Sequence, residues 1–454
     1  MAHAKRISTQ GVASVRLGAF LLGCSAFVAS TSLGQEIDRD PINYSVAAPR
    51  NAVSRLQELL DRGQGTLEYE PEHGYLRSLL RALDVPESSQ VLVFSKTSLQ
   101  RDRISPRTPR AIYFNDEVMI GSCLRGRVLE ISAADEVLGT AFYTLDQSEE
   151  TKPVPQRQTE SCLICHSSSA NQGFPGHVVR SLFVDRKGYP LLSSGTFRTD
   201  HKSPIAERWG GWYVTGTSGA QIHLGNMTIP GSRRPEVVDN SGGVNVVDLK
   251  DRFATSSYLT SHSDIVALMV LEHQAGMLNR LARAGMETRM ALHYEREMNK
   301  ALGRPDDAES PTTRSRIRSV GDAVVRYMLL GGEAPLTERI EGTSSFAADF
   351  SGRGPRDSKG RSLRDLDLNG RLFRYPCSYL IYTRSFDSLP VEVRDYVYRR
   401  LWEHLGESET GEEDRKSETG QEDPRLSAED RRAIIEILRE TKPGLPDYWK
   451  ASSP

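Results

Sequence analysis

The feature that most constrains this chain is a short stretch of two cysteines and a histidine, Cys162-Leu163-Ile164-Cys165-His166. Two residues separate the cysteines, and side chains three positions apart lie on the same face of a helix. One helical turn therefore places both thiols side by side, with the imidazole of His166 directly after them. Whatever fold surrounds this turn has to keep the three side chains together and chemically available.

The C-x-x-C-H pattern is the attachment signature of c-type haem. The thiols of Cys162 and Cys165 add to the two vinyl groups of the macrocycle and form thioethers, while the following histidine ligates the iron. The sequence therefore predicts one covalent haem c, with its iron, per chain. The predicted haem-binding residues are Cys162, Cys165 and His166, and His166 is the predicted proximal ligand.

Three other interpretations of the motif stay open. A thioredoxin-like redox pair needs a βαβ context, and no such pattern surrounds the motif. A structural zinc site needs two further ligands, and the sequence offers no second pair. A plain disulfide or a chance match is the third alternative. The haem interpretation requires that the chain leaves the cytosol, because the thioethers are made on the outer side of the membrane.

The N-terminus has the pattern of an export signal. An apolar run over residues 17–29 is followed by small residues, and cleavage is expected near Ser30 or Gly34. We predict a signal peptide over residues 1–34 and a periplasmic or otherwise exported protein. The basic residues that precede the apolar run are Lys5, Arg6 and Arg16.

Two alternatives for this segment also lead to export. One is a short membrane anchor that is never cut, and the other is a lipid anchor on Cys24, which follows Leu21-Leu22-Gly23. Apolar residues continue beyond Cys24, which counts against the lipid anchor. No apolar run is long enough to span a bilayer as a helix, so we expect no stable transmembrane segment in the mature chain.

The composition bears on the size of the core, on nucleic-acid binding and on the remaining cysteines. Of the 454 residues, 38% are hydrophobic, which is enough for a sizeable core in two or three lobes. The net charge of −2 gives no electrostatic case for binding nucleic acid. Cys123 and Cys377 lie outside the motif and the signal. They could form a disulfide in an oxidising compartment, although two buried free thiols are the favoured alternative.

The first third of the mature chain predicts two helices and then short strands. Helical spacing of apolar residues covers 51–62 and 73–83. Runs rich in Val, Ile, Tyr and Phe follow, with turn residues between them. We expect an N-terminal helix-plus-β-rich lobe over 35–150 with antiparallel strands. The strand-like runs are 91–94, 111–121, 127–131 and 137–145.

The middle of the chain, residues 151–256, is the predicted haem-binding section. After the motif, 177–185 and 189–197 predict a hairpin that turns at Lys187-Gly188. Residues 198–227 are dense in His, Arg and Trp, and 228–256 predict a loop.

The second half predicts a mainly helical lobe over 257–405. Ser261 is the expected N-cap of a helix that reaches about Leu302, with weak points at Gly276 and Gly285. The acidic stretch 406–424 predicts a disordered insertion, and 425–454 a last helix and tail. The expected fold class is therefore α+β. Two more helices are expected over 311–330 and 391–405.

The second axial position of the iron would decide the function, because a strong ligand gives an electron carrier and an open site permits small-molecule chemistry. Met227 lies in an extended, Pro-containing stretch, and His273 shares a helical face with apolar residues. Each of them is a candidate iron ligand, with an ordinary packing role as the alternative. Other candidates are His177, His201 and His223, and an open site also stays possible.

The run Arg208-Trp209-Gly210-Gly211-Trp212 suggests a clamp for the haem propionates. Guanidinium and indole N–H groups are donors that buried carboxylates need, and glycines allow a close approach of the backbone. Arg208, Trp209 and Trp212 are therefore candidate haem-binding residues. A structural turn in a hairpin is the favoured alternative.

Cys162, Cys165 and His166 resemble the attachment motif of the c-type cytochromes. The resemblance implies covalent haem, export before maturation and electron transfer with a redox partner protein. The stretches 105–116 and 208–216 are similar to a group of large exported bacterial cytochrome c-like proteins. The chain differs from an ordinary cytochrome c domain, which is all-helical and about 100 residues long. Dihaem peroxidases are similar in size but carry two such motifs.

These observations favour an exported monohaem electron carrier that exchanges electrons with a partner oxidoreductase. A haem c enzyme is the first alternative, with a peroxidase-like or oxidase-like open site lined by His177 or His201 and a nearby arginine. A haem-based redox or gas sensor is the second alternative.

Overall fold

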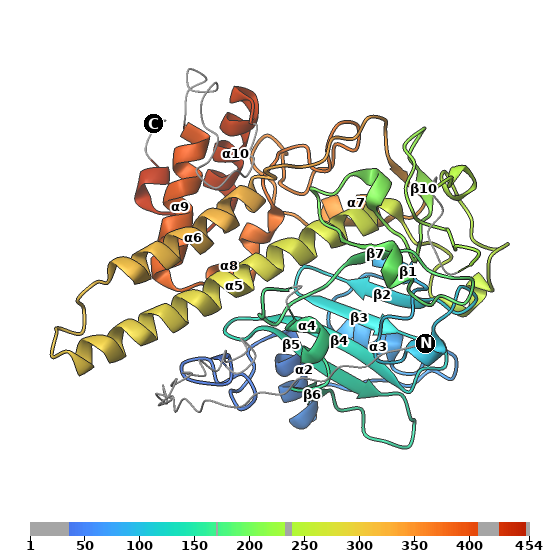
Figure 1. Ribbon diagram of the computed structural model, residues 1–454, viewed down its shortest axis with the longest axis horizontal. Helices are drawn as coiled ribbons and strands as arrows, with labels where there is room; N and C mark the ends of the chain where they lie inside the picture. The colour runs from blue at the N-terminus through green and yellow to red at the C-terminus, as the bar shows by residue number, and fades with distance from the viewer. Residues whose placement is uncertain (1–35, 169–170, 232–237, 407–425, 451–454) are drawn as a thin grey trace, which may run out of the picture.

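The computed structural model describes residues 36–168, 171–231, 238–406 and 426–450. The fold is α+β, as predicted, with most strands in the first half and the long helices in the second (Figure 1). The predicted signal peptide, with Cys24, lies outside the described residues, and so does nearly all of the predicted acidic insertion. Within the described residues, no helix is both long enough and apolar enough to cross a membrane.

A seven-stranded sheet forms the centre of the first half, in the order β6-β5-β4-β3-β2-β1-β9. All neighbouring strands are antiparallel, as expected. The last strand to join, β9, comes from beyond the motif and pairs with β1. The strands are β1 (Val91–Val93), β2 (Arg110–Phe114), β3 (Val118–Ser122), β4 (Val128–Asp135), β5 (Gly139–Asp146), β6 (Gln156–Gln158) and β9 (Trp212–Tyr213).

The two faces of this sheet pack against different partners. Because side chains alternate along a strand, Leu129 and Ile131 of β4 join a core with α2 (Ala52–Asp61) and α3 (Leu76–Ala82). Ala134, on the opposite face, packs toward α5 (Ile265–Ala301). Helix α5 therefore packs on the second face, and the motif lies on the same face at another point along the strands.

Helix α5 is continuous over 37 residues, so the weak points predicted at Gly276 and Gly285 are wrong. Gly276 allows close packing: a Cβ atom there would lie 1.9 Å from the Tyr327 hydroxyl of α6 (Pro311–Met328). The predicted cap is also wrong by three positions. Asp264, not Ser261, accepts hydrogen bonds from the first turn, at 2.8 Å from Val266 N. Asp264 also binds Thr343 N and so ties the helix start to a distant loop.

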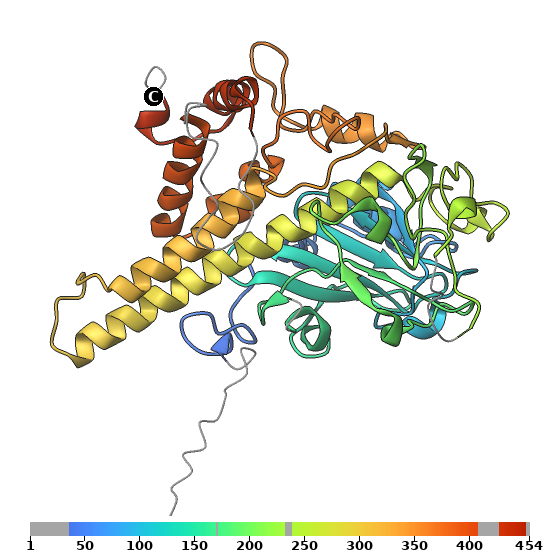
Figure 2. The same cartoon turned by 45° about the horizontal axis from the view of Figure 1, so that its top comes forward.

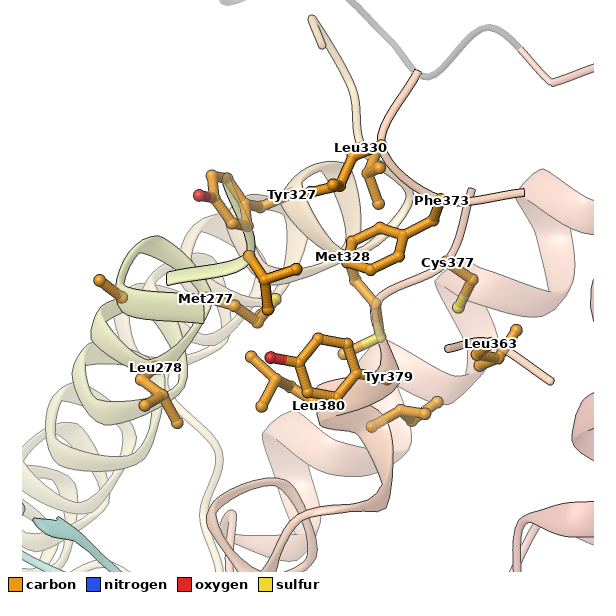
Figure 3. Packing of buried hydrophobic residues seen from close by; sticks show 14 of the residues in the cluster. Met277, Leu278, Tyr327, Met328, Leu330, Leu363, Phe373, Cys377, Tyr379 and Leu380 are labelled. Atoms are coloured by element: carbon orange, nitrogen blue, oxygen red, sulfur yellow. The ribbon is translucent and has the colours of Figure 1, made fainter. Parts of the chain in front are cut away.

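The helices of the second half pack around α5 and α6, which run side by side (Figure 2). The predicted helices at 311–330, at 391–405 and near the C-terminus agree with α6, α9 (Val391–Gly406) and α10 (Ala428–Thr441). Two short helices, α7 (Phe346–Gly352) and α8 (Arg384–Asp387), complete this layer. Residues that share one apolar centre (Figure 3) include Met277, Leu278, Tyr327, Met328, Phe373 and Tyr379.

Three small elements complete the described fold. The predicted hairpin is present but short, with β7 (Arg180–Leu182) paired to β8 (Thr196–Arg198) and Gly188 at a φ of +86° in its turn. Strands β10 (Gly216–Thr217) and β11 (Glu341–Gly342) join the middle of the chain to the helical half. The motif forms α4 (Leu163–His166).

Candidate functional site

The motif forms a single helical turn at the protein surface. The backbone N–H of His166 donates to the carbonyl of Cys162 at 3.0 Å, which closes the turn around both cysteines. Cys162 is half-buried and Cys165 is exposed, and both are free thiols. Ile164, between them, is 78% exposed. The turn therefore exposes Cys165 to solvent, whereas burial raises the pKa of the half-buried Cys162.

The sheet supplies the floor beneath this turn. The ring of Phe142, on β5, lies 4.8 Å from the ring of His166. Beside it, Arg110 and Glu130 form an ion pair at 2.7 Å, close enough to Cys162 and His166 to influence their charge. Gly121 makes this pair possible, because a Cβ atom there would overlap the Arg110 guanidinium. The floor is thus part apolar and part charged.

One nitrogen of His166 is anchored and the other is available. Nδ1 lies 2.9 Å from the carbonyl oxygen of Gly176. A carbonyl can only accept, so Nδ1 carries the proton and Nε2 keeps its lone pair. Nε2 makes no hydrogen bond to the described residues. Burial lowers the pKa of His166, which keeps the ring neutral at pH 7. A neutral imidazole with a free Nε2 is the form that ligates a metal.

A loop held by α5 fixes the anchoring carbonyl. The backbone N–H of His177, next to Gly176, donates to Asn279 Oδ1 at 2.7 Å, and Asn279 Nδ2 donates back to the His177 carbonyl at 2.7 Å. Asn171 Nδ2 donates to the carbonyl of His166 at 3.0 Å. The orientation of the His166 ring therefore depends on a helix that begins a hundred residues after the motif.

His177 lies over the neighbouring position of the same sheet face. Its Nε2 is 3.0 Å from the hydroxyl of Ser132, whose register partner on β5 is Phe142. Its Nδ1 is buried without a partner. Burial, and then the charge of His166, lower the pKa of His177 to about 3. Of the predicted second-ligand candidates, His177 is the one that the structure brings to His166.

The other histidine candidates lie in the core. His273 Nδ1 is 3.0 Å from Nδ1 of His201, and its Nε2 is 2.8 Å from the hydroxyl of Ser378. Both rings are buried, and burial lowers the pKa of His273 to about 3. His223 accepts from Gly225 N through Nδ1 and packs edge-on against Trp209. Both nitrogens of His273 are thus already bonded to protein.

Met227 is also in a packing position. It is partly buried against a small cluster that contains Phe183, Leu224 and Ile229. Among the described residues, no contact joins Met227 or His273 to the motif. The structure therefore does not bring either predicted metal ligand together with His166.

The residues of the Arg-Trp-Gly-Gly-Trp run are built into the core and the sheet. Arg208 forms a buried ion pair with Glu272 at 3.1 Å. Desolvation raises the pKa of Glu272 to about 7, opposed by the charge of Arg208. Trp209 is buried, and Trp212 belongs to β9 and donates from Nε1 to the carbonyl of Arg180 at 2.8 Å. All three candidate residues thus lie in the core or the sheet, and Arg180 lies near His166.

A pocket that the sequence analysis does not predict adjoins the loop that follows the motif. Its volume is about 390 Å³, and it lies between this loop, β8, α5 and α6. Its basic residues are far apart in the sequence, which is why no local pattern predicts it. They are Arg198, Lys202, Arg280, Arg283 and Arg326.

The structure also bears on the remaining cysteines and on other metal sites. Cys123 and Cys377 are both buried and both free, so the favoured alternative of two buried thiols describes them. Within the part of the chain that the structure describes, no group of three or more His, Cys, Asp or Glu side chains is arranged to hold a metal ion. A haem iron with a single histidine ligand would not form a group of three such side chains.

Comparisons of the chain with models of known protein families, with curated protein sequences and with solved structures each found no match. The functional argument therefore rests on the geometry of the motif and its surroundings.

Proposed function

We propose that this protein is an exported monohaem c-type electron carrier. The observation that carries the proposal is the state of His166: its Nδ1 is anchored to a backbone carbonyl, and its Nε2 is unpartnered on a turn that bears two free thiols. Metal-ligating histidines commonly donate their other N–H to a carbonyl in this way. The thiols of Cys162 and Cys165 would supply the thioethers.

The residues of the chain would orient and tune the bound group. The Gly176 carbonyl holds the His166 ring in one tautomer and raises the basicity of Nε2 as a ligand. Arg180 lies near His166 and forms no ion pair with any described residue, so its guanidinium is available to a haem carboxylate. Haem, when bound, supplies one-electron chemistry at its iron.

The surface position of the turn fits exchange with a partner protein. Cys165 and Ile164 are exposed, so a macrocycle attached here would keep one edge near solvent. A redox partner could approach this edge without a conformational change. Export to the periplasm, on the N-terminal pattern, is part of the same proposal.

Absorption spectroscopy on protein made in a host that matures haem c tests the proposal. We expect a covalent haem that survives denaturing electrophoresis, and its complete loss in Cys162→Ala/Cys165→Ala. Cys123→Ala is the matched control, because it removes a thiol outside the motif. If no covalent haem forms, or the double variant keeps it, the proposal is wrong.

A haem c enzyme is the second candidate, and the pocket beside the motif favours it. His177 and several arginines line this pocket, and a histidine with an arginine is a set that can move protons and stabilise charge. Carbon monoxide added to the reduced protein separates the two functions. Ready binding would favour the enzyme, and no binding the electron carrier.

A further inference from the structure

We propose that the pocket between the post-motif loop, α5 and α6 binds a small molecule through a carboxylate or phosphate group. The proposal goes beyond electron transfer and does not require haem. It rests on three features of the pocket: its charge, its buried unpartnered polar atoms and its size.

The charge of the pocket favours an anion. Five lining side chains are basic, and the one acidic lining residue is Asp200. Asp200 lies 3.8 Å from Arg280, at the outer limit of an ion pair, and so compensates little of this charge. Arg326 forms no ion pair with any described residue. Guanidinium groups bind carboxylate and phosphate oxygens through paired hydrogen bonds, so the pocket has the chemistry of an oxyanion-binding site.

Buried polar atoms without partners support the same ligand. Nδ1 of His177 and Nε of Arg326 are both buried and make no hydrogen bond, although both side chains line the pocket. Only about 6% of His177 is exposed. Leaving a buried donor unpaired costs about 1–3 kcal/mol, so such atoms commonly mark a site that a ligand or water completes. With the Ser132 hydroxyl donating to Nε2, the His177 Nδ1–H would be a donor to an anion.

Contacts within the protein hold two of the pocket's cations in place. The Arg280 guanidinium stacks on the ring of Tyr327, 3.6 Å from its centre, and donates to the Gly276 carbonyl at 2.9 Å. Arg283 is held by Glu287 at 2.7 Å and by the side chain of Gln172. Pre-placed charges lose little entropy on binding. A pocket of about 390 Å³ accommodates a small metabolite and excludes a macromolecule.

The test is calorimetric titration of the full chain with inorganic phosphate and with succinate at low salt. Arg326→Gln should weaken binding at least about tenfold, because it removes a charged donor. Arg316→Gln, an exposed change of the same charge on the same helix, should leave binding unchanged. If Arg326→Gln fails to fold, Lys202→Gln takes its place. Absence of saturable binding of both probes at millimolar concentration, or equal binding by Arg326→Gln and Arg316→Gln, would overturn the proposal.

A second arm separates a diffusible ligand from the carboxylates of the haem itself. The titration is repeated on haem-loaded protein and on Cys162→Ala/Cys165→Ala. Binding to both forms supports a pocket for a free oxyanion. Binding to the double variant alone would mean that haem carboxylates occupy the pocket, which overturns the proposal but not the haem function. Failure to attach haem leaves the titration of the variant as an independent result.

Discussion

His166 and His273 are both neutral histidines that contact an aromatic ring and depend on α5 for their position, yet they differ in the hydrogen bonding of their ring nitrogens. His166 has one nitrogen bonded to a carbonyl and the other without a partner, on a surface turn. His273 has both nitrogens bonded, to His201 and Ser378, inside the core. His166 thus keeps a nitrogen that could bind a metal, and His273 does not.

The surroundings of the two rings differ in the same sense. Near His273, the polar groups of Arg208 and Glu272 are buried and committed to one another. Near His166, the Arg110–Glu130 pair is still partly exposed, and the neighbouring thiols are free. We therefore expect the core cluster to serve stability and the motif to serve reactivity. The predictions below test this division.

The largest effect is expected from breaking the core ion pair. Glu272→Ala would leave the Arg208 charge buried and unpaired, which should lower the free energy of unfolding by about 3–5 kcal/mol. Glu130→Ala, at the motif, should lower it by about 1 kcal/mol, because that pair is better solvated. Urea unfolding of both variants measures the difference. Equal losses would contradict the division between core and motif.

The next test replaces each of the two histidines with alanine. His273→Ala removes two buried hydrogen bonds and a packed ring, and should lower the free energy of unfolding by about 2–4 kcal/mol. His166→Ala removes one half-buried hydrogen bond, with a loss of about 1 kcal/mol. On haem-loaded protein, His166→Ala should change the absorption spectrum, while His273→Ala should leave it unchanged. A spectral change in His273→Ala would make His273 a ligand candidate again.

A change on α5 can reach His273 without touching the motif. Gly276→Ala would push against Tyr327, which stacks on His273 at 5.4 Å between ring centres, and should destabilise the fold by about 1–3 kcal/mol. Gly285→Ala is the control, since its new Cβ atom meets only the side-chain ends of Arg289, at 3.0 Å, and of Leu389, at 3.6 Å. That variant should be neutral or more stable by up to about 1 kcal/mol. Thermal unfolding compares the two.

The effect that is smallest near neutral pH is the dependence of stability on pH itself. The pKa of His273 is about 3 in the folded protein and about 6.5 in the unfolded chain. Below pH 6.5 the unfolded state binds a proton that the folded state does not, so His273 lowers stability as the pH falls. The cost of His273→Gln should therefore shrink by up to about 1.4 kcal/mol per pH unit below 6.5. Urea unfolding at several pH values measures it, and a cost that is constant with pH would argue against a neutral buried ring.

Much of the fold could be predicted because it follows from local patterns. Alternation along β4 separates Leu129 and Ile131 from Glu130 and Ser132, and so fixes which face meets the α2–α3 core. The start of α5 was harder. Ser261 has a good capping pattern, but Asp264 gains extra hydrogen bonds from a loop near residue 343, which no local pattern contains. A two-residue strand such as β9 is also too short to show periodicity.

Of the candidate site, only the C-x-x-C-H motif itself could be predicted from the sequence. Cys162, Cys165 and His166 are adjacent in the sequence, so their spacing alone identifies them. The groups that orient His166 are a backbone carbonyl and the side chain of Asn279, and neither has a sequence signature. Candidates such as Arg208 carry suitable chemical groups, but these groups are bonded to partners that only the tertiary fold reveals.

The pairing of β9 with β1 turns the chain between them into a closed loop with the motif inside it. A protease cut at the Lys187-Gly188 turn would divide the chain into two polypeptides, but the pairing of β1 with β9 would still hold the two together. The nicked protein would migrate as one particle in solution and as two bands in detergent. The motif consequently cannot be excised as a separate domain by cutting on either side of it, because the strands beneath it precede it in the chain and the helix that holds its orienting loop, α5, follows it.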